Sequence, residues 1–264
     1  MKSCPLIKVI LNYVLSTLVL TLSLSACGQP TTRWEPDIMP ADLETDYALS
    51  ALPPRLRAGA SVYLFDAKRG YYEHRKGTNG FLCFVSRIDW EWEQYPKDLA
   101  TPISYDAEGA RTIFPVYKDV AAMGISGKYT PVQIRDTVVA RMKRGYYKAP
   151  ARPGVSYMLS PVMRVYPANP DNKEIVTMSF PHTMFYAPYM TNADIGGAGP
   201  HEQGPILLNA GQWILGERKA PHGYIIMPEG EMERAKILAD GKDLVNRLIA
   251  YKPYFRVAAD GGHH

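Results

Sequence analysis

The pattern of hydrophobic and polar positions predicts β-strands in the first third of the chain. Residues 61–65 and 71–75 are short runs rich in aromatic and apolar side chains, each bounded by turn residues. A third run, 81–88, follows Asn79-Gly80, a dipeptide typical of tight hairpin turns. Together these segments predict an antiparallel three-stranded meander.

The end of the third run has a pattern of its own. Residues 88–93, Ile-Asp-Trp-Glu-Trp-Glu, alternate with a period of two. In a strand, this period places Ile88 and both tryptophans on one face and the three acids on the other. One interpretation is a strand at the sheet edge with a buried and a wet face, which the pattern favours. The other is an aromatic platform for a sugar or a peptide.

Helical spacing appears first at residues 42–52, where Asp42 is the predicted N-cap and Pro53-Pro54 ends the segment. It appears again at residues 108–123. Pro115 lies within this second segment and predicts either a kink or the end of its first turn.

Two further helices are predicted later in the chain. Residues 132–144 follow Thr130-Pro131, an N-cap residue with proline at the first helical position. Residues 231–251 carry apolar side chains at helical spacing, with Gly241 as a weak point.

The second half of the chain returns to strands, and this order of elements indicates the fold class. Helices grouped between antiparallel strands, without regular alternation of strand and helix, favour an α+β fold over a parallel α/β sheet. We therefore expect one α+β domain over residues 41–255, with antiparallel meanders and three to four helices, and a disordered tail at 256–264. The further strands are expected at 156–159, 163–166, 175–186 and 223–227, with a turn at 169–172 and a surface loop at 191–204.

The N-terminus has the pattern of an export signal. Lys2 and Lys8 are followed by the largely apolar residues 9–24 and then by small residues. The four residues Leu24-Ser25-Ala26-Cys27 resemble the lipobox of bacterial lipoproteins. The alternative is an ordinary secretory signal that happens to have a cysteine at its end.

The resemblance to lipoproteins implies how the chain is processed and where it works. Residues 1–26 would be removed as a signal peptide, and the thiol of Cys27 would carry a diacylglyceryl group. Residues 27–40 would then be the lipidated cysteine and its tether, and two or more acyl chains hold a protein stably at a membrane. Gly28 implies the outer membrane in a host with two membranes, with the domain facing the periplasm.

A second resemblance covers four stretches of the remaining chain. Residues 52–60, 77–83, 106–109 and 184–188 are similar to exported bacterial proteins of uncharacterised function. This resemblance implies neither a fold nor an activity.

Charge and cysteine content exclude some classes of protein. The chain has 30 Lys and Arg, two of them in the predicted signal, against 26 Asp and Glu. This near-neutral balance lacks the excess of basic residues that is typical of nucleic-acid-binding proteins, so no nucleic-acid partner is expected. With Cys4 removed and Cys27 lipidated, Cys83 is the last cysteine, so no internal disulfide is expected. Its apolar neighbours predict a buried, inert thiol.

The candidate metal ligands lie around a glycine-rich region late in the chain. Histidine together with carboxylate binds Zn²⁺, so a zinc site is one interpretation. Their spacing matches no metal motif, and side chains that only form hydrogen bonds are the other interpretation. These residues are His182, Asp194, His201, Glu202 and His222.

A second cluster, Asp106, Glu108 and Arg111, lies at the entry to a predicted helix. The two carboxylates and the arginine could serve as acid and base in catalysis. Alternatively, one acid caps the helix and pairs with Arg111.

Two classes of function remain open. The first is a lipid-anchored binding or scaffold protein of the cell envelope with a protein or small-molecule ligand, in which no cofactor is expected. The second is an anchored hydrolase that uses the histidine and acid cluster, with or without zinc. Convergence in one pocket of three of the five candidate metal ligands would favour the hydrolase.

Overall fold

A mixed eight-stranded sheet forms the centre of the computed structural model, which describes residues 33–166, 174–196, 206–208, 212–215 and 219–257. The strand order is β2-β1-β3-β4-β5-β8-β10-β9, and every neighbouring pair is antiparallel except β1 and β3. With the helices described below, this arrangement confirms the α+β class. The strands are β1 (Ser61–Asp66), β2 (Gly70–Arg75), β3 (Leu82–Ser86), β4 (Thr101–Tyr105), β5 (Val155–Met158), β8 (His182–Tyr186), β9 (Ile206–Leu208) and β10 (Tyr224–Pro228).

The parallel pairing of β1 and β3 corrects the predicted meander. β1 and β2 form the expected hairpin, but β3 lies on the opposite side of β1 from β2. Asn79-Gly80 is therefore not a hairpin turn between β2 and β3. The Asn79 side chain instead donates to the carbonyl of Leu56 and accepts from the amide of Phe81, and these bonds hold the chain as it crosses back to β1.

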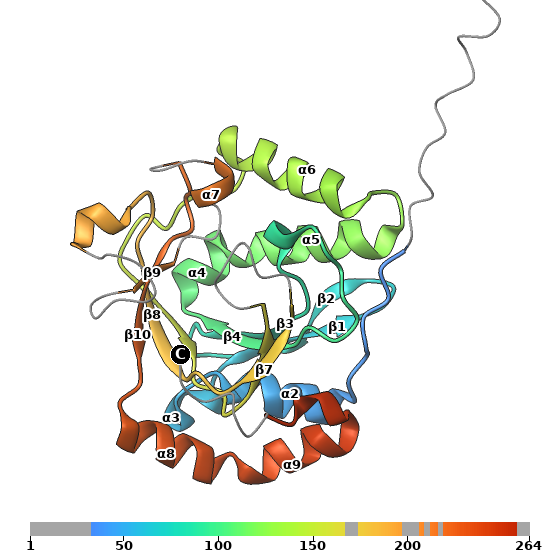
Figure 1. The fold of residues 1–264 in the computed structure, drawn as a ribbon, viewed down its shortest axis with the longest axis vertical. Helices are drawn as coiled ribbons and strands as arrows, with labels where there is room; N and C mark the ends of the chain where they lie inside the picture. Colours follow the sequence, from blue (N-terminus) through green and yellow to red (C-terminus); the bar gives the residue numbers. More distant parts are fainter. Residues whose placement is uncertain (1–32, 167–173, 197–205, 209–211, 216–218, 258–264) are drawn as a thin grey trace, which may run out of the picture. The chain divides into compact units, whose positions relative to one another are not determined.

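Helices cover both faces of the sheet (Figure 1). One face packs against α4 (Ala107–Thr112) and α5 (Phe114–Ser126), and α6 (Pro131–Lys143) packs against α5. The other face packs against α2 (Ala41–Ser50), and α9 (Lys242–Tyr251) packs against α2. The remaining elements are α3 (Pro54–Arg57), α7 (Gln212–Leu215), α8 (Glu231–Asp240), the 3₁₀ turns η1 (Trp90–Trp92), η2 (Asn192–Ile195) and η3 (Pro253–Phe255), and a two-stranded sheet of β6 (Met163–Val165) and β7 (Val176–Met178).

Helix boundaries follow the local signals in most places. Pro115 lies in the first turn of α5, so the predicted helix 108–123 is divided into α4 and α5. Thr130 caps α6 in a capping box with Gln133, as its sequence predicts. Gly241 separates α8 from α9. The N-cap of α2 is Pro40, so the prediction of Asp42 at this position was wrong.

The predicted long strand 175–186 is two strands. Its first part, β7, pairs with β6, whereas β8 belongs to the large sheet. Pro181 lies directly before β8 and cannot donate a ladder hydrogen bond, which favours an interruption there. The predicted turn 169–172 lies outside the described residues, as does most of the predicted loop 191–204.

Alternation along β3 divides the core between the two faces of the sheet. Leu82 and Phe84 belong to the apolar cluster under α4–α6, while Cys83 and Val85 belong to the cluster under α2 and α9. Cys83 has no exposed surface, and burial raises the pKa of its thiol to about 12. The prediction of a buried Cys83 is confirmed, and a thiol with so high a pKa is a poor nucleophile at neutral pH.

The compact unit begins at Arg33, before the predicted domain boundary at residue 41. Trp34 is buried, and its indole nitrogen donates to the carbonyl of Pro96 at 2.9 Å. Its ring also lies against Phe65, with 5.2 Å between the centroids. Residues 33–40 are therefore part of the packed domain rather than a free tether.

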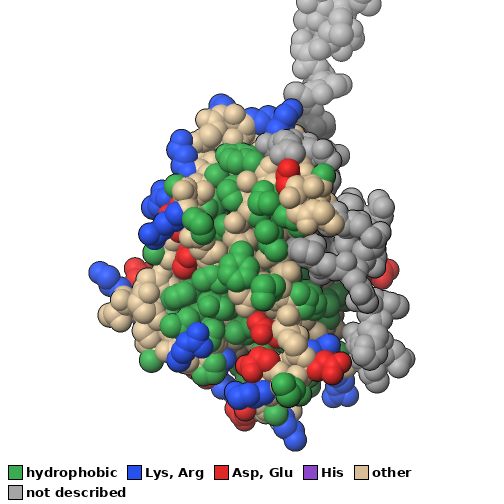
Figure 2. All heavy atoms as spheres, turned by 90° about the vertical axis from the view of Figure 1, so that its left-hand side faces the viewer, with side chains coloured by type: hydrophobic (Ala, Val, Ile, Leu, Met, Phe, Trp, Pro, Cys, Tyr) green, Lys and Arg blue, Asp and Glu red, His purple; other side chains and the backbone are tan. Residues whose placement is uncertain are grey.

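Hydrophobic side chains gather on the face that carries β8 to β10 (Figure 2). Phe185 of β8 and Met227 of β10 are exposed there, because alternation directs Met184 and Ile226 into the core. Among the described residues, no helix has the length and apolar character required to cross a membrane.

Candidate ligand-binding cavity

A cavity of about 160 Å³ lies between the sheet and the helices α5 and α6. Strands β4, β5, β8 and β10 each contribute side chains to its lining, and the segment after β3 enters it from the side. Its apolar part includes Ile103, Val116, Met142, Met158, Val165 and Met184. Its polar part consists of Asp89, Glu91, Thr101, Tyr105, Tyr117, Tyr166, His222 and Tyr224, with the rings of Trp90 and Trp92 between them.

The acidic run at 88–93 forms part of this cavity instead of a strand. Sheet pairing ends at Ser86, because the chain turns away and the side chain of Arg87 points inward to Glu44 of α2 at 3.1 Å. The following residues form the turn η1, with Trp90 and Trp92 buried. The expectation that the acids lie on a wet face was therefore wrong for Asp89 and Glu91, which line the cavity.

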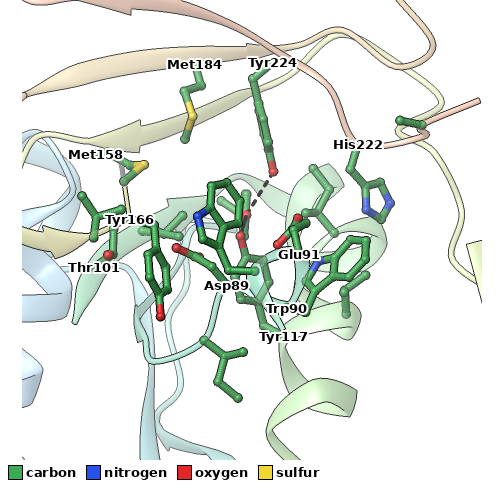
Figure 3. A pocket seen from close by; sticks show the side chains of 18 of the residues that line it. Asp89, Trp90, Glu91, Thr101, Tyr117, Met158, Tyr166, Met184, His222 and Tyr224 are labelled. Carbon is green, nitrogen blue, oxygen red and sulfur yellow. Dashed lines mark hydrogen bonds between the residues drawn. The ribbon is translucent and has the colours of Figure 1, made fainter. Parts of the chain in front are cut away.

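Figure 3 shows the Asp89 and Glu91 side chains among the rings of Trp90, Tyr117 and Tyr224. Both carboxylates lie deep in the protein, yet each keeps some accessible surface because it faces the cavity. Within the described part of the chain, no other residue donates a hydrogen bond to either carboxylate or forms an ion pair with it. Both carboxylates are thus available to a ligand in the cavity.

The environment shifts both carboxylates towards the neutral form. Burial raises the pKa of Asp89 to about 7, because the charged form loses its hydration. Burial raises the pKa of Glu91 well above its usual range, and the negative charge of Asp89 adds to this effect. No lysine or arginine acts on either group to oppose the shift. Both shifts favour the protonated acid, and at neutral pH Asp89 is close to its midpoint.

Three tyrosine hydroxyls meet beside the acids. Tyr105 of β4 lies 3.1 Å from Tyr224 of β10 and donates to Tyr117 of α5 at 3.4 Å. Burial raises the pKa of all three, so the hydroxyls remain protonated. On another wall, Tyr166 stacks on Trp92 with 5.6 Å between ring centroids. The cavity is therefore mainly aromatic, with hydroxyl and carboxyl groups concentrated at one side.

His222 reaches the cavity from the segment before β10 and forms a hydrogen bond from Nε2 to the carbonyl oxygen of Lys148 at 3.0 Å. Burial lowers its pKa to about 4, so the ring is neutral at physiological pH. A neutral imidazole that donates from Nε2 leaves Nδ1 as an acceptor. His222 is thus the only predicted metal-ligand candidate found in this cavity among the described residues.

Two other candidate metal ligands, His182 and Asp194, do not line this cavity. His182 pairs with Pro228 at the far end of β10, and six residues of extended chain from His222 correspond to about 20 Å. Its Nδ1 lies 2.6 Å from the carbonyl oxygen of Phe180. Asp194 lies in η2 and accepts hydrogen bonds from the amide and the hydroxyl of Thr191, the N-cap of that turn.

His201 and Glu202 lie outside the described residues. Within the part that the structure describes, no group of three or more His, Cys, Asp and Glu residues could hold a metal ion.

Asp106, Glu108 and Arg111 form a local structural network. Asp106 caps α4 by accepting from the amides of Glu108 and Gly109, and the hydroxyl of Tyr186 donates to the same carboxylate at 2.9 Å. Glu108 pairs with Arg111 at 2.7 Å and accepts from the amide of Ala151. Every carboxylate of this cluster thus has partners within the fold.

Comparison of the chain with protein-family models, with curated proteins and with solved structures gave no significant match. The geometry of the cavity is therefore the main basis for assigning a function.

Proposed function

We propose that this chain is a lipid-anchored binding protein of the cell envelope that holds a small molecule in the cavity beside Asp89. The cavity supports this proposal because it combines apolar walls with a few convergent polar groups, which is the usual composition of a ligand site. The anchor is supported by the residues Leu24-Ser25-Ala26-Cys27. A two-membrane host would hold the protein at its outer membrane, facing the periplasm.

The size of the cavity limits the size of the ligand. Its volume of about 160 Å³ is close to that of an engineered apolar cavity of roughly 150 Å³ that binds benzene. We therefore expect the buried part of the ligand to contain about six to ten non-hydrogen atoms.

A hydrolase is the second candidate, and one observation favours it. Asp89 has a raised pKa of about 7 in a cleft, which suits a general acid or base. Against this role, the described residues place no activated nucleophile beside it, and Cys83 is buried elsewhere. The zinc-dependent form would need His201 and Glu202, which lie outside the described residues.

Filling the cavity should abolish binding. Val165 of β6 lines the cavity, and Val176 of β7 is its cross-strand partner outside the lining. Both are partly buried, so each should accept a larger side chain at a similar cost. We expect Val165→Trp to weaken the binding of small neutral aromatics such as benzyl alcohol and phenol at least about tenfold, because the indole would occupy their place. Val176→Trp should leave the affinity within about twofold.

Ligand-observed NMR on the full chain purified in detergent measures these affinities, with detergent alone as the blank. Equal binding to the wild type and to Val165→Trp would place the probes outside the cavity. No binding of any small aromatic to the wild type would also contradict the proposed function. Thermal unfolding of both variants shows whether either substitution disturbs the fold.

A further inference from the structure

We propose that the cavity selects a cation, an amine or quaternary ammonium group carried on a compact apolar body. This inference rests on the proposed function and specifies the chemistry of its ligand.

Any charge that the described lining carries at neutral pH is negative. Among the described lining residues there are two carboxylic acids, one neutral histidine, and no lysine or arginine. A buried carboxylate without a partner is costly, because it gives up hydration and gains no opposite charge. A bound cation would supply that charge, so the cavity is complementary to a positive ligand.

The nearby basic side chains are paired with other groups. Arg87 leaves the same segment in the opposite direction and binds Glu44. Arg135 of α6 pairs with Glu93, the third acid of the run, and with Asp136. Since these guanidinium groups have partners of their own, the charge that would compensate Asp89 must come from outside the described residues.

The aromatic rings support the same ligand class. Trp90, Tyr117, Tyr166 and Tyr224 surround the two acids (Figure 3). The face of an aromatic ring attracts a cation, and cages of several rings recognise quaternary ammonium groups. The remaining wall, including Met158 and Met184, is apolar and would contact the uncharged part of the ligand. An anionic ligand would meet repulsion from the ionised Asp89 and no lysine or arginine among the described residues that line the cavity.

Binding of a cation should depend on pH through Asp89. Besides Asp89, the described titratable groups that face this cavity are Glu91 from η1, Tyr105 from β4, Tyr117 from α5, Tyr166 after β6, and His222 and Tyr224 at β10. Burial favours the protonated form of Glu91 and of the tyrosines, and the neutral form of His222. Between pH 5.5 and pH 8 the pH passes through the pKa of Asp89, which is about 7.

The direction of the pH dependence follows from the ionisation of Asp89. Below its pKa Asp89 is neutral and attracts a cation weakly, so affinity should rise with pH. For a permanently charged ligand we expect a gain of about tenfold between pH 5.5 and pH 8. Binding should also release protons, because the cation lowers the pKa of Asp89.

Choline and 3,3-dimethylbutan-1-ol are suitable probes, because they share one shape and differ in one positive charge. Isothermal titration of the full chain in detergent measures both affinities. At pH 8, choline should bind at least about tenfold more tightly than 3,3-dimethylbutan-1-ol. Asp89→Asn should remove most of that advantage, because the amide carries no charge at any pH. Glu93→Gln changes the acid that pairs with Arg135 outside the lining, and should have no effect on either ligand.

The fold of Asp89→Asn is checked by thermal unfolding at pH 8. Because the raised pKa means that ionisation of Asp89 disfavours the folded state, this variant should unfold at the same or a higher temperature than the wild type. Equal affinities for choline and the alcohol would overturn the cation proposal while leaving small-molecule binding intact. Binding of neither compound, while neutral aromatics still bind and respond to Val165→Trp, would overturn the cation proposal alone.

Discussion

Replacing Cys27 by serine should abolish attachment of lipid to this protein and leave an uncleaved precursor. The lipobox resemblance assigns the diacylglyceryl group to the thiol of Cys27, and a serine hydroxyl is not a substrate in that class of protein. Labelling cells with a clickable fatty acid measures the modification directly. We expect label on the wild-type chain and none above background on Cys27→Ser.

Cys4 provides the matched control, because it lies in the same N-terminal segment but outside the lipobox. Cys4→Ser should retain full label, and so should a variant at the buried Cys83. Membrane fractionation gives a second measurement, in which wild type and Cys4→Ser should enter the outer membrane of a two-membrane host. Equal label on the wild type and on Cys27→Ser would contradict the assignment of Cys27 as the lipidated residue.

The second large effect is expected at the buried ion pair between α2 and the segment after β3. Arg87 and Glu44 are both almost fully buried, and the Arg87 guanidinium donates to the Glu44 carboxylate at 3.1 Å. Glu44→Ala would leave the guanidinium buried without an anion. Loss of one partner of a buried pair costs about 3–5 kcal/mol, so the variant should be strongly destabilised.

Asp46 on the same helix gives the comparison. Its carboxylate pairs with Arg247 at 2.7 Å, but half of its side chain is exposed. Asp46→Ala should therefore reduce the free energy of unfolding by less than about 1 kcal/mol. Urea denaturation of both variants measures the difference. If the two variants have similar unfolding midpoints, the Glu44–Arg87 pair does not hold α2 to the sheet in the way that the structure indicates.

Local signals in the sequence predict most of the individual elements. The Thr130-Pro131 cap, the break at Pro115 and the burial of Cys83 all follow from chemistry within a few residues. The parallel pairing of β3 with β1 does not, because Asn79-Gly80 fits a hairpin as well as it fits the observed crossing. Which strands pair depends on contacts between distant segments, and a local turn preference does not determine them.

The candidate cavity was only partly predictable. The alternation at residues 88–93 identifies Trp90 and Trp92 as buried, but it places the acids in solvent. Asp89 instead faces inward because Arg87 is drawn towards Glu44 on α2, a contact between residues 43 positions apart. Tyr105 and Tyr224, whose hydroxyls meet beside it, are 119 positions apart and carry no local signal of their own.

The most direct test of the central claim is to locate a bound probe by crystallography. 4-Bromobenzylamine joins an amine to a compact aromatic body, and its bromine gives an anomalous signal that marks its position. Crystals of the protein grown with this compound should show the bromine within the apolar part of the cavity, near Met184, and the amine directed towards Asp89. An empty cavity, with bromine only on the exposed apolar face around Phe185 and Met227, would contradict the account.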